Sequence, residues 1–186
     1  MIVFSAMYGV ISFTFAYYGE MMTYLGMSAP MAVFSLVSWL RNPYEGKRSE
    51  VKVSALGAAE TVSIFVLSAV VTLVFYFILG ALGTANLLPS TLSVTTSFLA
   101  VCLTFRRSPY YAAAYAANDV VLVILWVTAS LSDASYVSVA VCFAVFLAND
   151  IYGFISWSRM KKRQEHGAQP SAKNGIGEFH RSRFLL

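Results

Sequence analysis

The sequence has few charged residues for its size. Only 12% of its 186 residues are Asp, Glu, Lys or Arg, compared with ~25% in an average soluble domain. Apolar residues make up 58% of the chain instead, and its mean hydropathy is +0.67. A water-soluble fold of this size could not bury that much apolar surface. The shortage of charge therefore excludes an ordinary soluble protein and indicates one that lies in a lipid bilayer.

Cysteine and histidine are scarce as well, with two residues of each. Cys102 and Cys142 lie in apolar stretches, where a thiol behaves as a small hydrophobe, so we predict neither a disulfide nor a metal site. His166 and His180 are isolated near the C-terminus and are assigned no metal. The sequence also has no Gly-rich phosphate loop, no nucleophile elbow and no paired metal-ligand motif. We therefore predict no enzyme activity, no cofactor and no ATP-driven pump.

Long apolar runs separated by short polar breaks make up most of the chain. A helix needs about 20 apolar residues to cross the ~30 Å hydrocarbon core. Helices are the only reasonable structure for such runs, because the bilayer offers the backbone no water. We predict an all-α integral membrane protein, a bundle of about six transmembrane helices over residues 2–17, 21–40, 58–82, 88–105, 110–131 and 136–157.

Basic residues follow the second, fourth and sixth of these runs: Arg41, Lys47, Arg48, Lys52; Arg106, Arg107; Arg159, Lys161, Lys162, Arg163. The opposite breaks hold only Glu20 and Asp133, which we place in outer turns. Because basic loops face the cytoplasm, we predict a multi-pass protein of the bacterial inner membrane with a cytoplasmic C-terminus. The same clusters account for the net charge of +4, so we expect the lipid bilayer and no nucleic acid as a partner. We expect residues 160–186 to form a flexible cytoplasmic tail, disordered from residue 164.

Two segments of the chain resemble each other. Residues 34–41 and 152–159 have Ser, Trp and Arg at identical places, and both end a helix that runs from outside to inside. The duplication is therefore parallel, unless aromatic and basic residues simply recur at any inner interface. The repeat predicts two helix triplets, the first without its first helix, joined by a cytoplasmic loop and a linker helix: 1–41, 42–57, 58–83 and 84–159.

Two Asn-Asp pairs lie inside predicted helices, Asn118-Asp119 and Asn149-Asp150. A carboxylate at such depth costs about 2.5–3.5 kcal/mol on insertion scales, so it normally faces a polar cavity or a partner. The two helices are antiparallel neighbours, and both pairs lie within about one turn of a common depth. We expect the four side chains to converge on one site. The alternative is that they only bond one another and hold helices together.

Aromatic residues continue this pattern along the fifth predicted helix. Tyr111, Tyr115 and Asn118 follow one another at steps of four and three and share a face, and Trp126 lies further along the same line. Aromatic rings can stack on a flat heteroaromatic ligand, while amide and carboxylate groups form hydrogen bonds to its polar groups. The spacing therefore predicts a site for a small molecule, with no metal and no catalytic residue.

Four stretches resemble those of PnuC-type nicotinamide riboside transporters: YGEMM at 18–22, WLRNPY at 39–44, LTFRRSPY at 103–110 and NDIYGFISW at 149–157. The resemblance extends over most of the chain, up to Arg163. It implies a three-plus-one-plus-three helix arrangement related to the SWEET sugar carriers, here without the first helix, and a homo-oligomer, the trimer of the family. At the family's Trp-x-x-Trp element this chain has Ala112 and Tyr115.

The resemblance also implies a function. Family members take up nicotinamide riboside, an NAD precursor, by facilitated diffusion, and a separate cytoplasmic kinase then traps it. The pyridinium ring of this substrate is cationic, so aromatic faces and a carboxylate such as Asp119 would suit it. The candidate substrate-binding residues are Tyr111, Tyr115, Asn118, Asp119, Trp126, Asn149, Asp150 and Tyr152. The alternatives are a carrier of another vitamin or a sugar, a membrane assembly subunit, and a membrane-embedded hydrolase.

Overall fold

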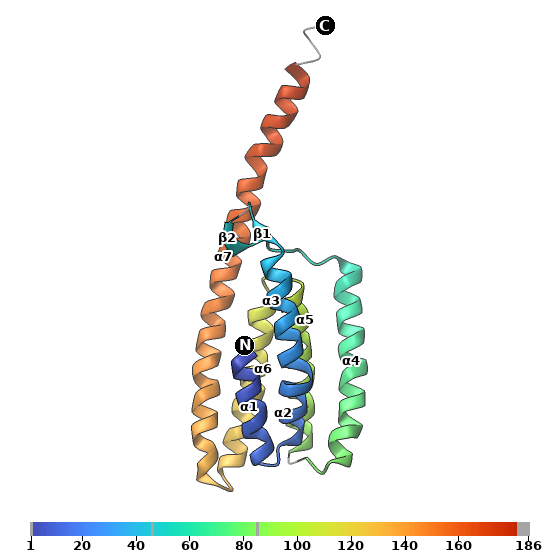
Figure 1. Cartoon of the computed structure of the whole chain (residues 1–186), viewed down its shortest axis with the longest axis vertical. Helices are drawn as coiled ribbons and strands as arrows, with labels where there is room; N and C mark the ends of the chain where they lie inside the picture. The colour runs from blue at the N-terminus through green and yellow to red at the C-terminus, as the bar shows by residue number, and fades with distance from the viewer. Residues whose placement is uncertain (1, 46, 85, 182–186) are drawn as a thin grey trace.

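The computed structural model describes residues 2–45, 47–84 and 86–181, with side chains for 2–45, 50–84 and 86–166. Most of this part of the chain is helical (Figure 1). The elements in chain order are α1 (Ile2–Thr14), α2 (Tyr18–Met21), the π-helix η1 (Met22–Ser28), α3 (Ala29–Leu40), β1 (Pro43–Tyr44), β2 (Lys47–Val51), α4 (Ala58–Ala81), α5 (Leu87–Phe105), α6 (Tyr111–Ser130), the 3-10 helix η2 (Ala134–Tyr136) and α7 (Val137–Arg181).

The described residues contain five helices that are long and apolar enough to cross a membrane: Tyr18–Leu40, Ala58–Ala81, Leu87–Phe105, Tyr111–Ser130 and Ala134–His166. The first of these joins α2, η1 and α3 into one continuous helix. α1 is also apolar but has 13 residues, fewer than the ~20 that a full crossing needs. The predicted all-α membrane bundle is therefore confirmed.

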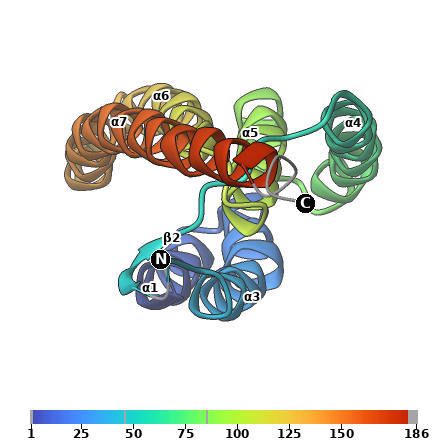
Figure 2. The same ribbon diagram turned by 90° about the horizontal axis from the view of Figure 1, so that it is seen from above.

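The helices form two groups with α5 between them (Figure 2). α1 and α3 lie on one side, α6 and α7 lie on the other, and α5 packs against both α3 and α6. α4 stands apart from the two groups and packs mainly against α5. This arrangement places the inner faces of α1, η1, α5 and α6 around a common core. The division into two equivalent triplets stays a prediction.

The helix over residues 18–40 is irregular in its first half. Its π-helical segment covers seven residues, and Pro30 follows within the first turn of α3. π-helical turns are rare and occur frequently at functional sites. Thr23, Tyr24 and Ser28 of this segment are buried, so the irregular turn faces the core.

The predicted inner loop at 42–57 contains a β-hairpin. β1 and β2 pair in antiparallel fashion, and the hairpin is held by the side chain of Gln164 on α7. The Gln164 amide donates a hydrogen bond to the Val51 carbonyl and accepts one from the Val53 amide, each 3.0 Å long. Two segments that are far apart in the sequence are therefore joined at the basic end of the bundle.

The predicted disordered tail after residue 163 is wrong as far as the backbone is described, because α7 continues to Arg181. Residues 182–186 of that tail lie outside the described part. The later part of α7 includes Lys161, Gln164 and Glu165, which are good helix formers. Lys161 and Glu165 also form an ion pair of 3.7 Å one turn apart, which adds a little to helix stability.

Candidate functional site

The largest group of buried apolar side chains joins the two groups of helices. Tyr8 of α1, Tyr24 of η1, Trp126 of α6 and Phe143 of α7 belong to it. The rings of Tyr8 and Tyr24 meet edge to face at 4.5 Å, and the Trp126 indole donates a 2.7 Å hydrogen bond to the Tyr8 hydroxyl. Such ring pairs prefer this geometry. The predicted residue Trp126 therefore lies in an aromatic cluster, not on the lipid-facing surface.

Asn118 lies beside this cluster and is 1% exposed. Its side-chain oxygen accepts hydrogen bonds from Thr96 (2.8 Å) and Ser97 (2.9 Å) of α5, and its amide donates one to the Tyr24 hydroxyl (3.2 Å). Because Tyr24 also contacts Tyr8, the amide is continuous with the aromatic rings. The structure thus places an amide next to aromatic faces in the core, as the spacing along α6 predicts.

Asp119 faces a different neighbour. Successive residues on a helix differ by about 100° in direction, so Asp119 turns toward α7, where its carboxyl interacts with that of Asp150. Asp119 is 5% exposed, and its Oδ2 atom has no hydrogen-bond partner among the described residues. Asn149 is exposed and donates a long hydrogen bond of 3.4 Å to Asp150.

The structure therefore does not bring both Asn-Asp pairs together as predicted. Asp119 and Asp150 meet, while Asn118 and Asn149 point elsewhere. Tyr152 is 72% exposed on the outer face of α7. The motif at 149–157 does not indicate which way the Tyr152 side chain points. Because Tyr152 follows Asp150 by two residues on a helix, its side chain points away from α6.

Tyr111 and Tyr115 belong to a second aromatic cluster nearer the basic end. The Tyr111 ring lies 4.8 Å from that of Trp157 and 6.2 Å from that of Tyr115. Trp39 completes the cluster at 5.0 Å from Trp157 and donates a hydrogen bond of 2.9 Å to the Thr104 carbonyl. Tyr115, Trp39 and Thr104 line a hollow of about 380 Å³ that also contacts α1 and α3.

Glu20 is the residue that sequence reasoning missed. We predict it in an outer turn, but α2 continues into the membrane helix and the side chain is 0% exposed. The Ser93 hydroxyl of α5 donates a 3.0 Å hydrogen bond to its Oε2 atom, and its Oε1 atom has no partner in the described part of the chain. The Tyr-Gly pair before it resembles a turn signal. One feature of the sequence does point to burial, because the Glu20 carboxylate directly precedes a long apolar run.

The interior has no basic side chain to balance these acids. Residues 2–40, 58–105 and 110–158 contain no Lys, Arg or His, although they include Glu20, Asp119 and Asp150. Basic residues outside these segments form ion pairs instead, as Arg106 does with Glu60. Because buried charges are normally paired, the core is suited to a cationic ligand and unsuited to an anionic one.

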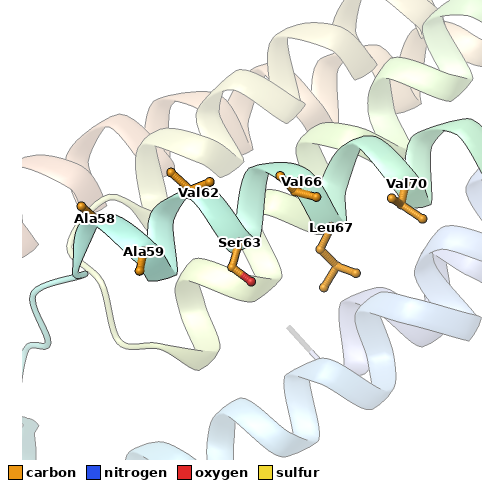
Figure 3. A pocket seen from close by; sticks show the side chains of 7 residues that line it. All are labelled: Ala58, Ala59, Val62, Ser63, Val66, Leu67 and Val70. Atoms are coloured by element: carbon orange, nitrogen blue, oxygen red, sulfur yellow. The ribbon is translucent and has the colours of Figure 1, made fainter.

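A hollow larger than the one beside Tyr115 lies elsewhere and is not a candidate site. It measures about 650 Å³ and runs along α4 (Figure 3). All the residues that line it belong to this one helix, and Ser63 is the single polar one among them. A groove formed by one helix cannot surround a polar solute, and its apolar lining fits the lipid-facing surface of a membrane helix.

Comparison with known proteins agrees with this picture. Residues 1–159 match the family described as nicotinamide mononucleotide transporter. The chain belongs to this transporter family. It is therefore a multi-pass membrane protein, and the resemblance to PnuC-type transporters drawn from its motifs is confirmed.

Two relatives within this transporter family are informative. The chain is 26% identical over 162 residues to the nicotinamide riboside transporter PnuC of Neisseria mucosa (strain ATCC 25996 / DSM 4631 / NCTC 10774 / M26), and the match covers 85% of the chain. The chain spans 62% of the length of that relative. A solved crystal structure of the vitamin B3 transporter PnuC superposes with a TM-score of 0.71 at 26% identity, covering 86% of this chain and 70% of that one.

Proposed function

We propose that the chain mediates facilitated uptake of nicotinamide riboside across the bacterial inner membrane. The observation that carries the proposal is a core in which an amide and carboxyls lie among aromatic rings without any basic side chain. Nicotinamide riboside has a flat pyridinium ring with one positive charge, a carboxamide and a ribose. Aromatic faces attract the cation, and the Asn118 amide can form hydrogen bonds with the carboxamide or the ribose. The relatives described above carry names that point to the same substrate.

The absence of basic residues favours the riboside over the mononucleotide named in the family description. The mononucleotide adds a phosphate, which carries about −1.5 to −2 charges at pH 7. An unpaired anion is strongly unfavourable in a buried site, and no Lys, Arg or His lies between residues 110 and 158 or in the other membrane segments. Phosphorylation by a cytoplasmic kinase would then keep the product inside, since the charged product could not return through the same core.

The transport cycle follows from the two groups of helices. Asn118 joins α6 to α5 and η1, and Trp126 joins α6 to α1. A substrate that enters between the groups replaces some of these internal hydrogen bonds with its own. The groups then rock about the occupied site and open it to the other side. This cycle needs no coupled energy source.

Orientation and assembly form part of the same proposal. The basic end, with Arg106, Arg163 and the hairpin, faces the cytoplasm, together with the C-terminus. The exposed apolar residues of α4, such as Phe65 and Phe77, face lipid or a neighbouring copy in a homo-oligomer, for which we propose the trimer.

The test is equilibrium binding of radiolabelled nicotinamide riboside to detergent-purified protein. We expect saturable binding, with nicotinamide mononucleotide at least tenfold weaker as a competitor. Asn149→Ala serves as a matched control, because Asn149 is exposed, and it should bind like the unaltered chain. Tight binding of thiamine, riboflavin or a sugar without binding of the riboside would assign another substrate.

A second candidate is a membrane assembly subunit. It is favoured by the three side-chain hydrogen bonds that Asn118 already makes within the chain, since polar residues in membranes often serve to hold helices together. In that case the purified protein binds none of these solutes, and substitution of Asn118 lowers its thermal stability alone.

A further inference from the structure

The carboxyl group of Glu20 lies in an aromatic environment with one oxygen unused. Tyr8, Tyr17 and Tyr24 are all buried, and each interacts electrostatically with Glu20. Ser93 donates to Oε2, while Oε1 has no partner in the described residues. A buried carboxylate with an unsatisfied oxygen is unfavourable unless a cation or proton joins it. A carboxylate with several tyrosine rings in its neighbourhood is also the chemistry that recognises organic cations.

Glu20 shares one polar surface with Asn118. Ser93, which donates to Glu20, and Ser97, which donates to Asn118, both lie on the buried face of α5. Four residues of helix separate them by about 6 Å. The carboxyl therefore lies about one helical turn from the amide, on its outer side.

Asp119 is the competing carboxylate, and its position is less suitable. It faces α7, where Asp150 already interacts with it, whereas Asn118 faces α5 and η1. Two facing acids repel each other unless they share a proton. Glu20 has no acidic neighbour among its recorded interactions, so no second carboxyl competes with it for a bound cation.

We propose that Glu20 determines specificity for cationic nucleosides by pairing with the positive charge of the cargo. This inference rests on the proposed transport of nicotinamide riboside and adds to it the residue that distinguishes a cationic substrate from a neutral one. The cation pairs with the unsatisfied oxygen and lies against the rings of Tyr8 and Tyr24. A neutral nucleoside of the same shape leaves the carboxyl unpaired and binds more weakly.

The test compares two ligands that differ in charge, the cationic riboside and its neutral reduced form, dihydronicotinamide riboside. The Glu20→Gln variant keeps the size of the side chain and an oxygen that can accept from Ser93, and it removes the charge. For the unaltered protein we expect at least tenfold tighter binding of the cation. In Glu20→Gln, affinity for the cation should fall at least tenfold, and affinity for the neutral form should stay within about twofold. Asp133→Asn, which removes an exposed acid at the outer end, should change neither.

The outcomes separate the two proposals. If Glu20→Gln binds both ligands with the same preference for the cation as the unaltered protein, the role of Glu20 is overturned and the proposal of nicotinamide riboside transport stands. Binding of neither ligand by the unaltered protein overturns the transport proposal and this inference with it. If Glu20→Gln does not fold, Glu20→Asp provides the test. Its carboxyl is withdrawn by one methylene, so affinity for the cation should fall severalfold while affinity for the neutral form stays unchanged. An unchanged ratio in Glu20→Asp overturns the inference.

Discussion

Replacement of Asn118 by alanine tests the core network most directly. It removes three hydrogen bonds that join α6 to α5 and η1. Interhelical hydrogen bonds in membrane proteins contribute ~0.6 kcal/mol each on average, so the three together contribute about 2 kcal/mol. Thr96 keeps backbone acceptors within its own helix, so it is not left unpaired. For a chain of this length we expect the melting temperature to fall by about 4–8 °C.

The same variant should also lose transport. The Asn118 amide donates a hydrogen bond to Tyr24 of the aromatic cluster, so its loss should weaken riboside binding at least tenfold. Thermal unfolding in detergent and uptake into proteoliposomes measure the two effects, with Asn149→Ala as the matched control. Unchanged stability and unchanged uptake in Asn118→Ala would refute both the network and the site. Reduced stability with unchanged affinity would favour the assembly subunit.

Three further predictions concern other parts of the chain. Gly19→Ala should destabilise the protein by about 1–3 kcal/mol, because the new Cβ atom would lie 2.9 Å from a leucine side chain of α4; Gly26→Ala, with nothing within 4 Å, should be neutral in the same thermal unfolding assay. The hydrogen bond from the Ser135 amide lowers the pKa of the exposed Asp133, so this cap stabilises the fold above the unfolded pKa of about 3.9 and is lost as the pH falls through the lower folded value. Asp133→Ala should therefore reduce the acid dependence of the melting temperature, and an identical pH profile would contradict this. Gln164→Ala should expose the hairpin to limited proteolysis, and an unchanged cleavage pattern would show that its two hydrogen bonds are dispensable.

Five of the six predicted runs correspond to helices long enough to span a membrane, since apolar length and helix breakers are local properties, while the run at 2–17 corresponds to the 13-residue α1. The predicted run at 58–82 differs from α4 by one residue, and the run at 88–105 differs from α5 by one. Spacing along a single helix was also informative. As predicted, Asn118 and Trp126 of α6 are buried inside the bundle, and Tyr115 packs against Tyr111 in the second aromatic cluster.

Side-chain direction relative to other helices was harder to predict. Asn118 and Asp119 are adjacent in sequence but face different helices, and only the packing of α5 and α7 around α6 decides which neighbour each one meets. Glu20 resembled a surface residue because its burial depends on α5, about 70 residues away in the chain. The π-helical turn and the hairpin likewise depend on tertiary contacts.

The family match ends at residue 159, whereas the side chain that holds the β-hairpin is Gln164. In a protein shortened at the family boundary, the Val51 carbonyl and the Val53 amide would lose their partner. Backbone contacts of the loop that enters α4, such as the bond from the Ser54 amide to the Arg107 carbonyl, would remain. We therefore expect a chain shortened at residue 159 to hold its hairpin less firmly than one that keeps Gln164.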